Sequence, residues 1–285
     1  MKRTKEEIWA MIMEFVHDHP EIVMIGTEGS RNNPEKEEDV FTDFDVTFFV
    51  ENEQDIIRFE QLDWETLWGK TIVTQVLHEN FLENHECNKF AYTRMSLFED
   101  GNRIDLKIIP ASEKMRYLEA DTLNTIVWGG EKRATSDVIH HVKPPTPEEL
   151  EECINEFYWV STYVFKGIKR GDFLYAAGHF EKIVRVELFR LMSWCYFIGE
   201  NVGKEWSRLA EIEKEIPQKY YGFSTLEQLH SSLVMAIEKF EETLKKMKIP
   251  IPEYARKTRK YIEENGTISI SGKEKRRGAF RSLSQ

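Results

Sequence analysis

The feature that most constrains this sequence is a small-residue turn between two apolar segments, the second of which opens with two carboxylates. The first segment, residues 22–26, leads to Gly29-Ser30-Arg31, and the second begins within Asp43-Phe44-Asp45. Side chains alternate between the two faces of a strand, so Asp43 and Asp45 are expected to share one face. The turn can offer backbone N–H groups and a hydroxyl to phosphate oxygens. This order favours a sheet that brings carboxylates and a phosphate-binding turn together.

A third acid, Asp105, lies on a further predicted strand. That strand, 103–109, follows 92–98 across Glu99-Asp100-Gly101-Asn102, a strong hairpin turn. Arg103, Asp105 and Lys107 alternate with apolar residues, so Asp105 is expected on a polar face. A single acid on a strand is usually only solvated, and it is the combination with the earlier pair that indicates function. Magnesium prefers carboxylates together with substrate phosphates, so the three acids predict a site for a metal-bound nucleoside triphosphate.

Composition narrows the class of protein. The chain has 285 residues, 41% hydrophobic, and a net charge of −11. That charge argues against a nucleic-acid binder and weakly favours a cationic substrate. We expect neither a signal peptide nor a membrane span. Three widely spaced cysteines form no disulfide or zinc pattern, which indicates a cytoplasmic protein.

The pattern along the chain predicts two domains. Pro144-Pro145-Thr146-Pro147 interrupts any regular element, because proline fixes φ and removes a donor. Before it, periodicity predicts helices over 5–17 and 55–68 and strands over 21–26, 43–50 and 71–77, besides the hairpin. After it, helices are predicted over 148–170, 173–198 and 226–247. The pattern therefore predicts an α+β fold class, with a β-sheet domain over 1–143, an α-helical bundle domain over 147–265 and a disordered basic tail over 266–285.

Four segments carry a family resemblance. They are Gly29-Ser30-Arg31-Asn32, Thr42-Asp43-Phe44-Asp45-Val46, the run from Leu97 to Leu106, and the run from Asn155 to Val160 with that from Tyr163 to Gly167. With these, residues 1–265 resemble the aminoglycoside 6-adenylyltransferases, or streptomycin adenylyltransferases, of the nucleotidyltransferase superfamily. The resemblance implies a five-stranded mixed sheet, a helical C-terminal domain and a cleft between them. Gly26-Thr27-Glu28 departs from the more apolar approach expected there, and we expect it not to touch the catalytic set.

The resemblance implies that the chain transfers AMP from MgATP to a hydroxyl of an aminoglycoside and releases pyrophosphate, with streptomycin the expected acceptor. Asp43 and Asp45 would bridge two Mg²⁺ ions. Asp105 would complete the metal site or take the hydroxyl proton, and the sequence leaves both roles open. Ser30 and Arg31 would hold the β- and γ-phosphates, although Arg31 could also be an ordinary surface arginine.

The helical domain supplies further candidates for binding. Lys166 and Lys182 would contact phosphate, unless they are merely solvated. Tyr158, Trp159 and Tyr163 would wall the nucleotide or sugar pocket, with core packing as the alternative for each. Asp172 is favoured among the acids that would meet ammonium or guanidinium groups, a set that also includes Glu152 and Glu156.

Two other functions stay open. The same metal acids would serve nucleotidyl transfer to another acceptor, such as a lincosamide or a protein hydroxyl. A non-catalytic nucleotide-binding module is the third hypothesis, and the presence of all three acids argues against it. The expected partners are ATP and a cationic aminoglycoside, with no nucleic acid or membrane. The oligomeric state is open, with a monomer favoured.

Overall fold

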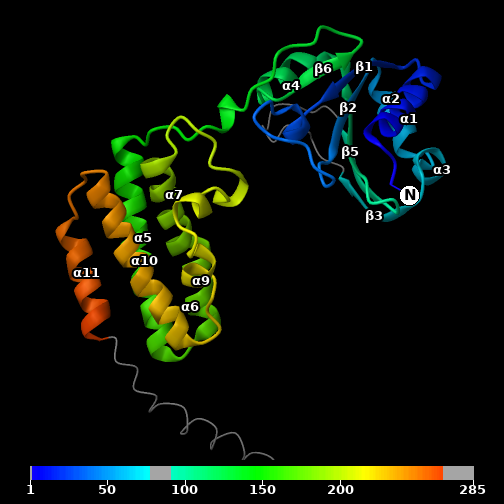
Figure 1. The fold of residues 1–285 in the computed structure, drawn as a ribbon. Coiled ribbons are helices and arrows are strands. Elements are labelled where there is room, and N and C mark those ends of the chain that lie inside the picture. Colours follow the sequence, from blue (N-terminus) through cyan, green and yellow to red (C-terminus); the bar gives the residue numbers. More distant parts are fainter. Residues whose placement is uncertain (1, 78–90, 266–285) are drawn as a thin grey trace, which may run out of the picture. The chain divides into compact units, whose positions relative to one another are not determined.

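A computed structural model of the chain describes residues 2–77 and 91–265 (Figure 1). The chain divides into two compact units, Met1–Ile139 and His140–Gln285. The first contains the sheet and the second is helical. The predicted basic tail, residues 266–285, and Cys87 lie outside the described residues, whereas Cys153 and Cys195 are free thiols.

The described strands of the first unit form a six-stranded mixed sheet in the order β3-β4-β5-β2-β1-β6. The strands are β1 (Ile22–Thr27), β2 (Phe44–Val50), β3 (Thr71–Leu77), β4 (Tyr92–Phe98), β5 (Arg103–Pro110) and β6 (Thr125–Trp128). The pair β2 and β5 is parallel, and the other neighbours are antiparallel. The expected five-stranded sheet is wrong by one strand. The additional strand, β6, has four residues at the sheet edge, too few to show an alternating pattern.

The hairpin between β4 and β5 is confirmed. Gly101 has φ +82°, a backbone conformation that glycine adopts without steric cost. The side chain of Asp100 accepts from the backbone N–H of Asn102 at 3.0 Å, and the Arg3 Nε donates to the same carboxylate at 2.6 Å. The turn is therefore anchored to the N-terminal segment just before β5 begins.

Apolar cores lie on both faces of the central strands of the sheet. On one face the helices α1 (Lys5–Asp18), α2 (Glu53–Glu60) and α3 (Trp64–Trp68) enclose a core that includes Phe44, Val46 and Phe48. A smaller core on the other face contains Phe49 and Tyr117, the latter from α4 (Lys114–Ala120). The two cores place alternate residues of β2 on opposite faces, as the sequence pattern predicted.

The single helix predicted over 55–68 is wrong, since the segment forms α2 and α3. Asp63 caps α3 by accepting from the Thr66 backbone N–H at 3.3 Å. Trp64 then donates its indole N–H across the break to the Phe59 carbonyl at 2.9 Å. The break turns Trp64 and Trp68 into the core, where each is buried, and this tertiary packing overrides the helical periodicity.

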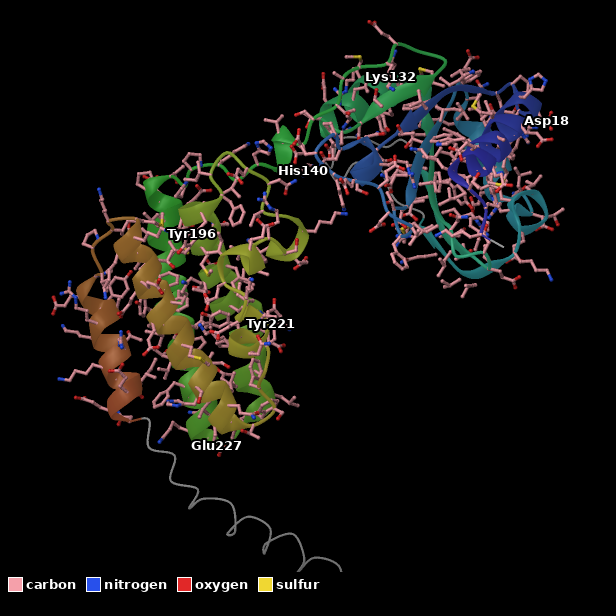
Figure 2. The ribbon with its side chains drawn as sticks, in the orientation of Figure 1. Asp18, Lys132, His140, Tyr196, Tyr221 and Glu227 are labelled. Atoms are coloured by element: carbon pink, nitrogen blue, oxygen red, sulfur yellow. The ribbon has the colours of Figure 1, made fainter. Side chains whose placement is uncertain are left out.

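The second unit is a bundle around one apolar core. Its helices are α5 (Pro147–Arg170), α6 (Phe173–His179), α7 (Arg185–Tyr196), α8 (Leu209–Ile212), α9 (Ile216–Tyr220), α10 (Leu226–Lys246) and α11 (Glu253–Glu264). Helix α5 begins in a capping box of Thr146 and Glu149 and ends at Gly171, which has φ +72°. Figure 2 shows Tyr196, where α7 ends, and Glu227, near the beginning of α10, at opposite ends of this unit.

The helix predicted over 173–198 is also interrupted. A π-helical turn, Phe180–Val184, separates α6 from α7. Such a turn accommodates one extra residue and shifts the apolar stripe, and both Phe180 and Val184 still reach the core. No helix in the described part of the chain is long and apolar enough to cross a membrane.

Candidate active site

Two of the three predicted acids, Asp45 and Asp105, lie on one face of the sheet, and Asp43 lies at the edge of that face. In the parallel pairing of β2 with β5, Asp45 lies directly opposite Asp105, just as Phe44 lies opposite Ile104. Residues that face each other in this register point the same way, so both carboxylates leave the sheet on the side away from the buried Phe44 and Ile104. Asp43 directly precedes β2, and the three acids together are called the acid face below. The fold thus brings together acids separated by about sixty positions in the sequence.

A guanidinium group lies among these acids. Arg103 binds Asp105 through two parallel hydrogen bonds, Nε to Oδ1 at 2.9 Å and Nη2 to Oδ2 at 2.8 Å. Its third nitrogen, Nη1, is 3.6 Å from Oδ2 of Asp43. The sequence pattern predicted Arg103 on the same polar face as Asp105, but it did not indicate that the arginine bridges two of the acids.

The carboxyl group of Asp45 is buried among like charges. Burial, followed by the negative charges of Glu28, Asp105 and Asp43, raises its pKa to about 6, and Lys107 opposes the shift. The electrostatic field at this position therefore favours a bound cation or a proton.

The Gly29-Ser30-Arg31 turn runs against Asp45. It forms a short 3₁₀ helix, η1 (Gly29–Asn32), that begins two residues after β1. Gly29 has φ +72°, and a Cβ atom on it would lie 2.4 Å from Oδ2 of Asp45. The glycine is therefore required both by backbone conformation and by the close approach of the carboxylate.

Glu28 also belongs to this side of the sheet, and the expectation that it does not touch the catalytic set is wrong. Its carboxylate accepts from Thr47 Oγ1 at 2.9 Å and from Lys107 Nζ at 2.7 Å. Its charge is the largest single electrostatic contribution to the raised pKa of Asp45. The sequence did contain a signal for this position. Glu28 directly follows β1 and directly precedes the Gly-Ser-Arg turn, which puts it at the same edge of the sheet as that turn.

Arg31 contacts the segment that carries the acids. Its Nη2 and Nε donate to the carbonyls of Thr42 and Asp43 at 2.6 and 3.2 Å, and its Nη1 pairs with Glu38. The guanidinium also lies over the ring of Phe44 at 4.0 Å. Arg31 thus ties the turn to the beginning of β2. Its contact with phosphate stays a prediction, as does that of Ser30, which is half-buried in η1.

Asn32 extends the same turn toward the sheet edge and was not predicted. Its side-chain amide donates to Thr27 Oγ1 at 3.0 Å and to the Leu123 carbonyl at 2.8 Å. These bonds fix the end of the turn to β1 and to the segment before β6. Asparagine directly after Gly-Ser-Arg was the available signal.

The aromatic candidates of α5 divide into two groups. Tyr158 is 1% exposed and packs against Phe157 and Phe240, so it takes the alternative of core packing. Trp159 is 57% exposed and donates its indole N–H to Tyr163 Oη at 2.9 Å. Trp159 and Tyr163 therefore form one surface feature, while Tyr158 does not reach that surface.

The charged candidates of the helical unit each have different surroundings. The Lys166 ammonium is 4.6 Å from the centre of the Tyr163 ring, a cation–π contact that joins it to the surface pair. Asp172 caps α6 by accepting from the Tyr175 backbone N–H at 3.2 Å. Lys182 is an exposed residue of the π-helical turn. Asp172 thus has a structural role in this fold, and no described contact unites it with either lysine.

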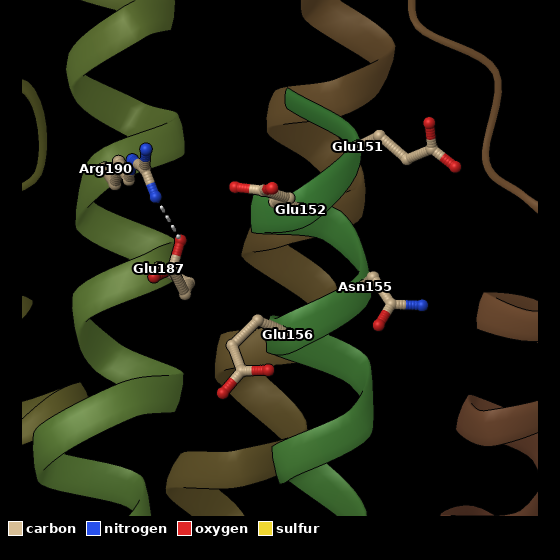
Figure 3. A pocket seen from close by; sticks show the side chains of 6 residues that line it. All are labelled: Glu151, Glu152, Asn155, Glu156, Glu187 and Arg190. Atoms are coloured by element: carbon tan, nitrogen blue, oxygen red, sulfur yellow. Dashed lines mark hydrogen bonds and ion pairs between the residues drawn. The ribbon is translucent and has the colours of Figure 1, made fainter. Parts of the chain in front are cut away.

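An acidic groove of about 490 Å³ lies elsewhere in the helical unit. Figure 3 shows α5 and α7 facing each other across it, with acids contributed by both. It is lined by Glu151, Glu152, Asn155, Glu156, Glu187 and Arg190. Glu152 and Glu156 were predicted to meet cationic groups. Glu187 and Arg190 were missed, because the approach of α7 to these glutamates depends on how α5 packs against α7. Arg190 Nη1 is 3.5 Å from Glu187, so the lining keeps a negative excess.

The acid face suits a hard cation in its chemistry. Its donors are carboxylate oxygens, the ligands that Mg²⁺ takes in proteins alongside substrate phosphates. As the side chains lie, no three carboxylate, imidazole or thiol groups of the described residues are gathered closely enough to hold a metal ion. The two hydrogen bonds from Arg103 direct the carboxylate of Asp105 toward the guanidinium, which is a physical reason why it does not converge with the other carboxylates.

Comparison with known proteins places the chain in a family. The family profile of streptomycin adenylyltransferase matches residues 2–264. An aminoglycoside 6-adenylyltransferase of Staphylococcus aureus is 34% identical over 212 residues, covering 72% of this chain and 73% of its own. One from Bacillus subtilis is 30% identical over 281 residues, covering 92% and 97%. The profile spans both units, including the strands that bring the three acids together. The chain therefore belongs to the streptomycin adenylyltransferase family and is a nucleotidyltransferase.

Proposed function

We propose that this enzyme transfers the adenylyl group of MgATP to a hydroxyl of an aminoglycoside, with streptomycin the preferred acceptor and pyrophosphate the second product. The observation that carries the proposal is the register of β2 and β5, which sets Asp45 opposite Asp105 with Asp43 beside them. Nucleotidyl transfer needs such an anionic face because the triphosphate arrives with its cation.

In this proposal the acceptor oxygen forms a bond to the α-phosphorus of ATP as the bond to the bridging oxygen of the β-phosphate breaks. Pyrophosphate takes the bonding electrons, and the hydroxyl loses its proton. Asp43, Asp45 and Asp105 would hold Mg²⁺, two ions in the full assembly. Bound there, the metal would neutralise charge on the attacking and leaving oxygens. The Oδ atoms of Asp105 are also the candidate acceptors of the hydroxyl proton, once Arg103 releases them.

The turn before β2 is the proposed phosphate-binding element. Gly29 permits the close approach to Asp45, and Ser30 follows on the same turn. Arg31 holds this turn to the acid-bearing segment and is proposed to share the β- and γ-phosphates with Ser30. Lys166 and Lys182 remain proposed phosphate contacts of the helical unit.

The acidic groove supports a cationic acceptor. Four glutamates and one arginine line it, so its net charge at neutral pH favours ammonium and guanidinium groups. Streptomycin carries two guanidinium groups, whereas lincosamides present far less positive charge. We propose that Glu152 and Glu156 contribute to acceptor binding, with the surface pair of Trp159 and Tyr163 as a further contact and Asp172 as a secondary acid.

The experiment is a pyrophosphate-release assay with purified full-length protein, MgATP and a single acceptor at a time. Release is expected only when an aminoglycoside is added, with the highest kcat/KM for streptomycin compared with kanamycin and lincomycin. The Asp45→Asn variant serves as the control for contaminating activity. A preference for kanamycin or lincomycin would overturn the proposal that streptomycin is the preferred acceptor. Pyrophosphate release that does not depend on any added acceptor would overturn the proposed transfer reaction.

A further inference from the structure

Arg103 places a positive charge where the proposed function needs a metal ion. Its guanidinium makes two short, parallel bonds to Asp105 and lies 3.6 Å from Asp43. Bidentate pairs of this kind are among the stronger ionic contacts in proteins. The acids on this face thus already have a cation of the protein's own, and a metal ion has to compete with it for Asp105.

We propose that Arg103 is the counter-ion of the metal-free site, and that it must release Asp105 before a metal ion binds there. This inference rests on the proposed function, because it takes the acid face to be the metal site. Its consequence concerns the order of binding. A free metal ion that takes Asp105 leaves the guanidinium of Arg103 without its bidentate partner. A metal–nucleotide complex brings phosphate oxygens that the guanidinium can contact instead. Arg103 therefore favours entry of the metal together with the nucleotide.

The geometry allows Arg103 to make this exchange. Its side chain is 44% exposed, while that of Asp105 is only 16% exposed. The arginine lies at the first position of β5, beside the hairpin turn, so its long side chain can move while Asp105 stays in register with Asp45. The planar fork of a guanidinium matches phosphate oxygens as well as it matches a carboxylate.

The first experiment measures Mn²⁺ binding to the full-length protein without nucleotide or acceptor, by electron paramagnetic resonance. Removing the competing charge in Arg103→Met is expected to tighten Mn²⁺ binding about fivefold, in keeping with a partly exposed ion pair. Arg103→Lys keeps a charge and should fall between the two. Arg58→Met is the matched control, since Arg58 pairs with Asp55 at 3.1 Å outside the acid face, and it should bind Mn²⁺ as the wild type does.

Equal or weaker Mn²⁺ binding by Arg103→Met would overturn the inference, because an arginine that merely positions Asp105 would leave a poorer site when removed. The same titration in Asp45→Asn separates this inference from the proposed function. If Asp45→Asn leaves Mn²⁺ binding intact, the acid face is not the metal site and the proposed function fails with it. If Asp45→Asn removes binding but Arg103→Met does not tighten it, only the role of Arg103 fails.

A second readout is thermal unfolding, which also shows whether the variants fold. Without Arg103 the acids repel one another, so Arg103→Met is expected to have a lower Tm than the wild type in a chelator. Added Mn²⁺ should raise its Tm by more than it raises that of the wild type, because ligand stabilisation grows with affinity. If Arg103→Met does not fold, Arg103→Gln is measured in its place. Identical Tm values and identical shifts would count against the proposed role.

Discussion

The two acid-rich regions of this protein are built in opposite ways. On the sheet, Asp45 and Asp105 face each other because two parallel strands are in register, and burial with neighbouring charges raises the pKa of Asp45 to about 6. In the acidic groove, Glu152 and Glu156 are exposed side chains one turn apart on α5. The first arrangement fixes the positions of oxygen atoms, as metal binding demands. The second arrangement provides a negative electrostatic potential without fixed atomic positions, which suits the attraction of a flexible cationic ligand.

The largest effect is expected on the sheet. Asp45→Asn should lower kcat by about 10²- to 10³-fold, because the neutral amide no longer offers an anionic ligand where charge develops. The fold should survive, and the Tm in a chelator should not fall, since a buried charge among like charges is removed. Steady-state pyrophosphate release and thermal unfolding measure the two effects.

The control for this variant is Asp39→Asn, an exposed acid in the segment before β2. It is expected to keep its activity. If Asp45→Asn turned over at the wild-type rate, the acids of the sheet would have no larger catalytic role than the glutamates of the acidic groove.

A smaller loss is expected from Gly29→Ala, which tests whether the sheet acids need their close packing. The new Cβ atom would lie 2.4 Å from Oδ2 of Asp45, so the carboxylate has to move. The positive φ adds about 1 kcal/mol of destabilisation. We expect activity to fall about tenfold or more, since small displacements of positioned groups are costly in catalysis. Initial rates and urea unfolding provide the comparison.

Gly101→Ala is the matched variant, because Gly101 also has positive φ but a Cβ atom added there would meet no other atom within 4 Å. It should share the loss of stability and keep the activity. Equal activity losses in both variants would mean that backbone strain, and not displacement of Asp45, is responsible.

In the groove the expected effects are modest. Glu152→Gln combined with Glu156→Gln should raise the KM for streptomycin about three- to tenfold while kcat changes little, because exposed ion pairs contribute little each. The wild-type KM should rise with salt, and the double variant should respond less, since salt screens charges over about 10 Å. Glu148→Gln, at the exposed beginning of the same helix, is the control. A kcat collapse with unchanged KM would assign these glutamates to chemistry instead.

The smallest effect concerns His230, which contrasts with both acid regions because it is a base held neutral. Its Nε2 is buried with no hydrogen-bond partner among the described residues, and burial, then the charge of Lys169, lowers its pKa. The unfolded chain therefore takes up a proton first as the pH falls through about 6.5, so the free energy of unfolding declines below that pH and levels off below the folded pKa.

His230→Gln should remove this part of the acid sensitivity. Urea unfolding followed by circular dichroism between about pH 8 and pH 5 measures it. The comparison is His179→Gln, because the Nδ1 of wild-type His179 lies 2.8 Å from the Tyr175 carbonyl. If His230→Gln left the pH dependence of the free energy of unfolding unchanged, His230 would not contribute to the loss of stability at acidic pH.

The sequence predicts this structure well where the physics is local. Alternation along β2 and β5 placed Asp45 and Asp105 on polar strand faces, and the run Pro144-Pro145-Thr146-Pro147 marked where α5 begins. Prediction fails where packing decides. The break before Trp64 depends on burying two tryptophans, and the π-helical turn leaves no compositional mark. The contact of Glu28 with Lys107 depends on the final packing of the sheet, and the approach of Glu187 to the glutamates of α5 depends on how α5 packs against α7, so no spacing along the chain predicts either one.

The register of β2 against β5 also bears on which changes in length this protein can accept. Successive residues of a strand alternate between faces, so one residue inserted between Arg103 and Asp105 would turn the carboxylate toward the apolar core. Substitutions on the surrounding surface leave that alignment alone, and insertions in the segment between η1 and β2 can be absorbed before the strand begins. Among natural variants of this sequence, we therefore expect gaps to collect outside β2 and β5, even where residue identities within those strands have drifted.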